Sequence, residues 1–116
     1  MLVHNFKCGE EVYDKEPSYE SARNTLMNEM YEKSDAFKNG SLPRTCGLES
    51  SYAYNKIDGR VSYDGKTRWR LDYDPKKGVH FNIEDYSRGK GFNGINIVIP
   101  IDISYEQYKK IINLWN

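Results

Sequence analysis

Hydrophobic and polar residues alternate along much of the second half of the chain. Four segments there are rich in β-branched and aromatic residues, and turn residues such as Asp64-Gly65 separate them. The segments occupy positions 60–63, 67–73, 79–86 and 95–99. Because consecutive strands joined by short turns pair in opposite directions, the pattern predicts an antiparallel meander of about four strands.

A helical periodicity precedes the strands. From residue 18, apolar side chains recur at steps of three and four residues, which predicts an amphipathic helix that ends near Phe37, before Asn39-Gly40. The residues of this stripe are Tyr19, Ala22, Leu26, Met27, Met30 and Tyr31. Near the end of the chain, Ser104 and Gln107 form a capping-box pattern that predicts a second, short helix.

The remaining segments lack a clear period. Residues 1–16 are polar and are expected to form an irregular arm, and residues 41–47 are expected to form a loop. At 116 residues the chain has the size of one domain. We therefore predict a single α+β domain over residues 17–116, with an N-terminal helix packed on the antiparallel meander and a short C-terminal helix.

Side chains alternate across a strand, so each predicted strand has an apolar row and a polar row. The apolar rows and the inward positions of the helices predict the core. Its expected members are Trp69, Leu71, Tyr73, Phe81, Ile83, Ile97, Leu26, Met30 and Ile111. When both apolar rows pack on the same helix, both polar rows face the same way. The polar surface then carries Arg68, Arg70, His80, Asn82, Glu84 and Tyr86.

This polar surface combines an imidazole, a carboxylate and two guanidinium groups, which are the groups that metal-free cleavage of an RNA phosphodiester requires. A base takes the proton of the 2′-hydroxyl, an acid protonates the departing 5′-oxygen, and fixed positive charge stabilises the transition state. Histidine suits a proton step because its reference pKa of ~6.5 leaves both forms available near neutral pH. We expect His80, Glu84, Arg70 and Arg68 to be catalytic, with Asn82 orienting the phosphate or ribose.

The loop after the third predicted strand adds cationic and hydroxyl groups. Glycines in this loop let backbone N–H groups approach an anion closely. Tyr86, Arg88 and Lys90 are therefore expected to bind substrate together with Asn82. The same residues also fit a simpler structure, because the solvated face of an antiparallel sheet normally carries paired charged side chains.

Composition narrows the range of partners and cofactors. The 17 basic and 17 acidic residues cancel, so any contact with nucleic acid or an anionic membrane needs a local patch. No segment approaches the ~20 apolar residues of a membrane span, and no motif supplies the ligands of a bound metal. Cys8 and Cys46 have no metal-ligand spacing and can be free thiols or one bridge. We expect no cofactor and no membrane contact.

Part of the chain resembles a known class of proteins. The run from Arg70 to Asp85, with its DYDP, KG, HFN and E elements, is followed by Gly-Lys-Gly at 89–91 and by Ile-Val-Ile-Pro at 97–100. This string resembles C-terminal toxin modules of bacterial polymorphic toxins, and residues 21–26 show a weaker resemblance to the same modules. Many such modules look like metal-independent ribonucleases of the barnase and EndoU-like group, which place a helix before a curved antiparallel sheet.

The resemblance has further implications and two departures. Where the active sites of that group use a histidine, His80 is the matching residue, with Glu84 and the arginines as its partners. The sheet lacks the second histidine of some members, and the helix after Pro100 is an addition to the simplest version of the fold. Such toxins act beside a dedicated immunity protein, so the resemblance implies that partner. It also implies secretion within a larger bacterial toxin and action in the target-cell cytoplasm.

Two functions from different classes follow. The first is a metal-independent ribonuclease toxin domain with an RNA substrate, expected to be a monomer. The alternative is a non-catalytic protein-binding module that uses the polar sheet face and the aromatic loops, since Tyr and Arg are enriched at interface hot spots.

Overall fold

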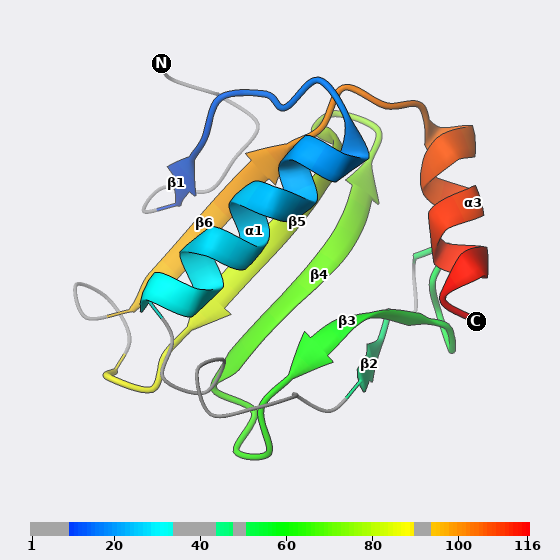
Figure 1. Cartoon of the computed structure of the whole chain (residues 1–116). Coiled ribbons are helices and arrows are strands. Elements are labelled where there is room, and N and C mark those ends of the chain that lie inside the picture. Colours follow the sequence, from blue (N-terminus) through cyan, green and yellow to red (C-terminus); the bar gives the residue numbers. More distant parts are fainter. Residues whose placement is uncertain (1–9, 34–43, 48–50, 90–93) are drawn as a thin grey trace.

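A computed structural model describes residues 10–33, 44–47, 51–89 and 94–116. Figure 1 shows the order of the helices and strands along the chain. They are β1 (Glu11–Val12), α1 (Tyr19–Lys33), β2 (Arg44–Cys46), β3 (Ile57–Val61), β4 (Thr67–Asp74), β5 (Gly78–Asp85), β6 (Ile95–Pro100) and α3 (Tyr105–Leu114). The predicted α+β class is confirmed.

The strands form one mixed sheet in the order β1-β6-β5-β4-β3-β2. The predicted meander is its centre: β3, β4, β5 and β6 pair antiparallel in succession, and their bounds differ from the expected ones by at most three residues. Two short strands were not predicted. β1 pairs parallel with β6 inside residues 1–16, so the arm that was expected to be irregular contains a strand. β2 pairs antiparallel with β3 inside the segment expected to be a loop.

The two extra strands have a common physical origin. They are two and three residues long, too short to show an alternating pattern. Their neighbours in the sheet determine them through backbone hydrogen bonds. Every residue can accept such a bond through its carbonyl, and every residue except proline can donate one. The amide of Tyr13, directly after β1, donates to the carbonyl of Val98 at 2.9 Å, and that of Glu16 donates to the carbonyl of Pro100 at 2.8 Å. The loop expectation for 44–46 is therefore wrong.

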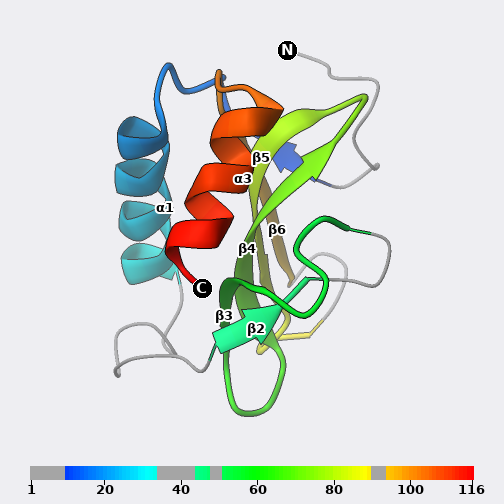
Figure 2. The ribbon, with the colours of Figure 1, turned by 90° about the vertical axis from the view of Figure 1, so that its right-hand side faces the viewer.

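Both helices cover the same face of the sheet, as Figure 2 shows. The predicted core is confirmed for seven of its nine members, which are Trp69, Leu71, Phe81, Ile83, Ile97, Leu26 and Met30. Tyr73 and Ile111 are only partly buried and pack against this cluster. The core places the apolar rows of β4 and β5 under the helices, so the polar rows lie on the opposite face.

The ends of the helices follow local sequence signals. The Ser104 hydroxyl accepts from the amide of Gln107 and the Gln107 side chain accepts from the amide of Ser104, so the predicted capping box is confirmed. Helix α1 begins close to the expected position, and Ser18 caps it by accepting from the amide of Ser21 at 3.1 Å. The expected extension of this helix to Phe37 lies outside the described residues.

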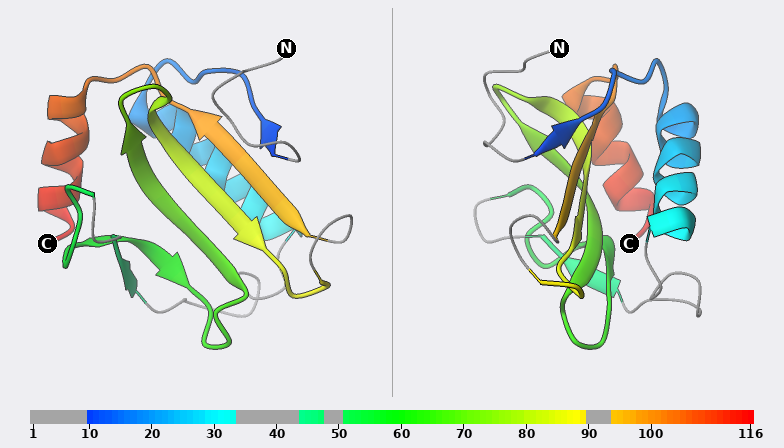
Figure 3. Two further views of the ribbon diagram at one scale, coloured as in Figure 1. Left: turned by 180° about the vertical axis from the view of Figure 1, so that it is seen from behind. Right: turned by 90° about the vertical axis from the view of Figure 1, so that its left-hand side faces the viewer.

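The central hairpin is bent. Figures 2 and 3 show the turn that joins β4 to β5 leaning away from the two helices. The polar rows therefore lie on the inner side of the bend, and neither α1 nor α3 covers them. At the neighbouring strand, a Cβ atom on Gly59 would lie 1.9 Å from the carbonyl oxygen of Trp69. Only glycine lets β3 approach β4 this closely.

Candidate active site

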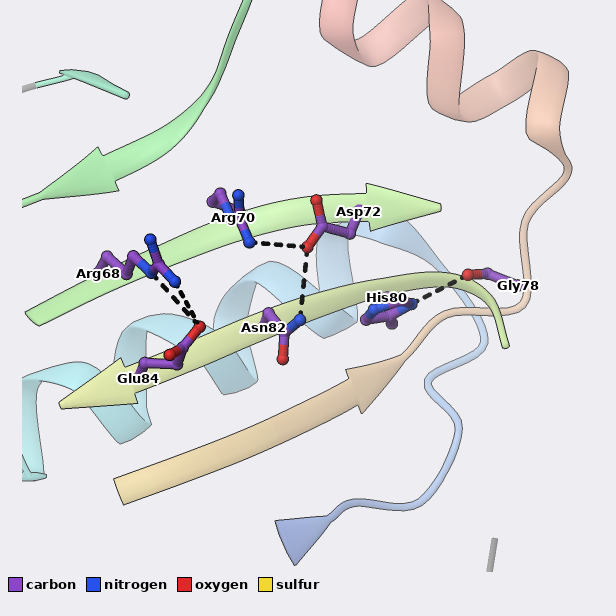
Figure 4. A network of polar contacts seen from close by, with 7 residues as sticks. All are labelled: Arg68, Arg70, Asp72, Gly78, His80, Asn82 and Glu84. Atoms are coloured by element: carbon purple, nitrogen blue, oxygen red, sulfur yellow. Dashed lines mark hydrogen bonds and ion pairs between the residues drawn. The ribbon is translucent and has the colours of Figure 1, made fainter. Parts of the chain in front are cut away.

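The register of the central hairpin brings the predicted polar residues together. Arg68 lies opposite Glu84, Arg70 opposite Asn82, and Asp72 opposite His80. Directly opposite residues of an antiparallel pair project from the same face of the sheet. We call these six residues the polar face: Arg68, Arg70, Asp72, His80, Asn82 and Glu84. Figure 4 shows them side by side on β4 and β5.

One end of the polar face is an exposed ion pair. The guanidinium of Arg68 donates through Nε and Nη2 to Oε1 of Glu84, at 3.3 and 3.1 Å. The side chains are 39% and 18% exposed, so both remain accessible to a ligand. A surface ion pair of this kind contributes little to stability. A carboxylate and a guanidinium therefore lie side by side at this end of the polar face, where a ligand can reach both.

The middle of the polar face is more enclosed. Arg70 is 8% exposed, and its Nη2 atom lies 3.8 Å from Oδ2 of Asp72. Asn82 donates to the same oxygen from Nδ2 at 3.4 Å. Because guanidinium groups stay protonated in proteins, Arg70 places a permanent positive charge beside Asp72. Asn82 lies between His80 and Glu84 in Figure 4, as expected from the strand.

His80 occupies the other end and is buried, with 3% of its surface exposed. Its Nδ1 atom lies 3.0 Å from the carbonyl oxygen of Gly78. A carbonyl only accepts, so Nδ1 carries the proton and Nε2 is an acceptor in the neutral ring. Burial lowers the pKa of His80, although the Gly78 carbonyl and the Asp72 carboxylate act in the opposite direction. His80 is therefore suited to accept rather than donate a proton at neutral pH.

The predicted substrate-binding residues separate into three groups. Asn82 belongs to the polar face. Tyr86 directly follows β5 and is partly buried; burial, and next a hydrogen bond with Glu84, raise its pKa above the usual value. Its phenol therefore keeps its proton beside Glu84. Arg88 is exposed in the loop after β5, and Lys90 lies outside the described residues.

A buried carboxylate on β3 was missed by the sequence analysis. Asp58 is 1% exposed, and neither of its carboxylate oxygens has a hydrogen-bond partner in the part of the chain that the structure describes. Burial, and next the charge of Asp72, raise its pKa to about 7, against the opposing effect of Arg70. The only sequence signal is an acidic residue between Ile57 and Gly59 in a short strand. Nothing local distinguishes it from a solvated residue.

The raised pKa of Asp58 predicts a pH-dependent stability. In the unfolded chain this carboxyl releases its proton near the usual pKa of 3.8, whereas the folded chain holds the proton to about pH 7. The contribution of Asp58 to the free energy of unfolding is therefore fully present below pH 3.8 and is lost as the pH rises through about 7. Asp58→Asn, which cannot ionise, should therefore gain stability relative to the parent between pH 5 and pH 8. Urea unfolding midpoints at both pH values measure this gain.

The exposed Asp102 provides a matched control for that measurement. Asp102→Asn should differ from the parent by the same amount at both pH values. A constant difference between Asp58→Asn and the parent would contradict the raised pKa of Asp58.

The described residues contain neither a metal-binding cluster nor a membrane-spanning helix. In those ranges no three His, Cys, Asp or Glu side chains gather as a metal-binding group. Among the described helices, none is long and apolar enough to cross a membrane. Cys46 is exposed and is a free thiol, while Cys8 lies outside the described residues. No protein-family model and no curated protein sequence matches this chain.

Proposed function

We propose that this chain is a metal-independent ribonuclease toxin domain that cleaves RNA phosphodiesters by general acid/base catalysis on the polar face. The observation that carries the proposal is the register of β4 and β5, which sets Arg68 against Glu84 and Arg70 against Asn82 on a face that no described helix covers. The resemblance to toxin modules covers the same two strands.

The accessible end of the polar face suits the proton transfers. Glu84, which accepts hydrogen bonds from Arg68, takes the proton of the 2′-hydroxyl. Tyr86 is hydrogen-bonded to Glu84, and this position places its phenolic O–H to donate a proton to the departing 5′-oxygen. Arg68 exchanges part of its contact with Glu84 for the phosphate, and Arg70 adds a second positive charge that is already fixed in place.

The buried end suits a supporting role. Because only 3% of His80 is exposed, we assign it to positioning the centre of the polar face rather than to direct contact with the scissile phosphate. Among the surrounding charges, that of Asp72 has the largest effect on the pKa of His80. Asp72 in turn contacts Arg70 and Asn82. Loss of the ring would therefore disturb the guanidinium that the reaction uses.

Cleavage of total RNA tests the proposal and its metal independence together. The purified domain should degrade RNA at the same rate with magnesium and with excess EDTA, because the proposed proton and charge groups are side chains. End-group analysis should find 2′,3′-cyclic phosphate on the products, as expected when the 2′-hydroxyl attacks. Activity that EDTA abolishes and one divalent ion restores would contradict the mechanism. Absence of any cleavage would contradict the function.

The second candidate is a protein-binding module. It is favoured by the low exposure of His80 and Arg70, which leaves less of the polar face open to a substrate than a catalytic site normally needs. A cognate immunity protein is the partner that the resemblance to toxin modules implies, since a ribonuclease toxin must be inhibited in the cell that makes it. The proposal includes delivery within a larger bacterial toxin into a target-cell cytoplasm.

A further inference from the structure

A pocket of about 220 Å³ lies at the end of the sheet where the β4–β5 turn, the segment before β3 and helix α3 meet. Its walls come from three separate parts of the chain and are mostly aromatic. They are Ser51, Tyr52, Tyr73, Pro75, Tyr105 and Tyr108. We call this the tyrosine pocket. It is smaller than the pockets that enclose drug-sized molecules, which restricts an occupant to one small flat group or one side chain.

The four tyrosine rings are packed so that they present aromatic surface to the pocket. The ring centroids of Tyr73 and Tyr105 are 4.3 Å apart, and those of Tyr105 and Tyr108 are 5.9 Å apart at an interplanar angle of 19°. Tyr52 meets Tyr105 edge-on at 6.3 Å. Tyr108 is 2% exposed and held rigidly, while Tyr105 is 37% exposed and accessible from solvent. Such a platform suits stacking of a flat ligand.

Two lysines, Lys56 and Lys109, lie beside this aromatic surface. The ammonium of Lys56 lies 4.1 Å from the centroid of the Tyr52 ring and donates to the neutral side chain of Asn113 at 3.1 Å. The hydrogen bond with Lys56 also holds the pKa of Tyr52 below its usual value. Lys109 lies 4.8 Å from the centroid of Tyr105, with Glu106 as its ion-pair partner at 3.1 Å. Lys76 and Lys77 follow Pro75 in the adjoining turn.

The tyrosine pocket lies at the His80 end of the central hairpin, on the opposite face of the sheet from the polar face. Tyr73 and Asp72 are successive residues of β4, so their side chains leave the strand on opposite faces near its end. Burial raises the pKa of Tyr108, and the next contributions come from the charges of Asp72 and Asp58. The phenol of Tyr108 is therefore within electrostatic range of the polar face. A strand of nucleic acid that contacts both sites would have to pass around the β4–β5 turn, because β3 and β6 flank the hairpin on its two sides.

We propose that the tyrosine pocket is a subsite that stacks one base of a single-stranded RNA, with Lys56 and Lys109 beside the adjoining phosphates. The inference rests on the proposed ribonuclease function and names where a nucleotide several positions along the RNA from the cleaved bond is held, because Tyr73 lies roughly 17 Å along β4 from Arg68. Aromatic rings combined with a basic rim are the usual means of binding single strands without reading their sequence. Such binding tolerates any base, because every base has a π-face.

Binding of a non-cleavable RNA tests the subsite separately from catalysis. The probe is a fluorescein-labelled octamer of mixed sequence with 2′-O-methyl groups throughout, which lacks the attacking hydroxyl. Tyr105→Ala should raise the Kd about tenfold, the size expected for loss of one stacked base. Tyr105→Phe keeps the ring and should bind as the parent does. Tyr63→Ala, at a tyrosine that is 93% exposed in the β3–β4 turn, should also leave the Kd unchanged.

Lys56→Gln tests the subsite independently, in case Tyr105→Ala impairs folding. Lys56→Gln leaves every ring in place and should weaken binding mainly at low salt, with a shallower dependence of the Kd on salt concentration. Unfolding midpoints of all variants should match that of the parent.

The outcomes separate the subsite from the proposed function. The subsite proposal is wrong if the parent and Tyr105→Ala bind the RNA equally well, or if the parent does not bind it. If binding is equal and the parent still cleaves RNA, the ribonuclease function stands. The pocket then has another occupant, such as a side chain of a partner protein. Ring-dependent binding without any cleavage by the parent would support the subsite and overturn the ribonuclease function.

Discussion

Replacing Glu84 by glutamine should lower RNA cleavage about 10²-fold or more while leaving the fold intact. The carboxylate is the accessible proton acceptor of the polar face, and losing a general base costs a factor of this size. The amide keeps the shape of the side chain and still accepts from Arg68, which limits any structural effect. Initial rates on a defined RNA substrate measure the change.

Glu20→Gln is the matched control for that experiment. The residue lies in the first turn of α1, on the other side of the sheet, and its side chain is exposed. It should cleave as the parent does. Equal activity of the Glu84→Gln protein and the parent would remove Glu84 from the mechanism and favour the protein-binding module.

His80→Ala should give a different result because its ring is buried. Cleavage should fall, and the unfolding midpoint should fall with it, since the substitution leaves a cavity beside Asp72. The sequence predicts that both His80 and Glu84 are catalytic. Their Cα atoms are four residues apart along one strand, which is roughly 13 Å in an extended chain, so the two side chains are too far apart for direct contact.

Truncating Leu71 to alanine should lower the free energy of unfolding by about 2 to 5 kcal/mol. Leu71 is 0% exposed, lies in the middle of β4 and is opposite Phe81 in the register. Removing its side chain leaves a cavity between the sheet and the helices, and a β-strand at the centre of the sheet has little freedom to collapse into it. Denaturant titration measures the loss.

Leu114→Ala provides the same substitution at the surface. Leu114 is 83% exposed at the end of α3, so its truncation should change stability by no more than about 0.5 kcal/mol. Equal unfolding midpoints for Leu71→Ala and the parent would refute the placement of the β4 apolar row in the core.

The sequence alone was sufficient for the centre of the fold. Alternation along β4 and β5 is a local property, and it correctly predicted which rows are buried and that Arg68, Asn82 and Glu84 share the opposite face. The capping box at Ser104 was equally readable, because its two hydrogen bonds join residues three positions apart. These features depend on the period of the backbone and on near neighbours in the chain.

Tertiary structure decided the rest. The strands β1 and β2 exist because neighbouring strands offer unpaired backbone groups, which no pattern in two or three residues can signal. The burial of His80, the raised pKa of Asp58 and the tyrosine pocket likewise depend on distant segments. The pocket joins Tyr52, Tyr73 and Tyr105 from three elements. Solvent exclusion and electrostatic effects arise from all the atoms around a group, so they appear only when the chain has folded.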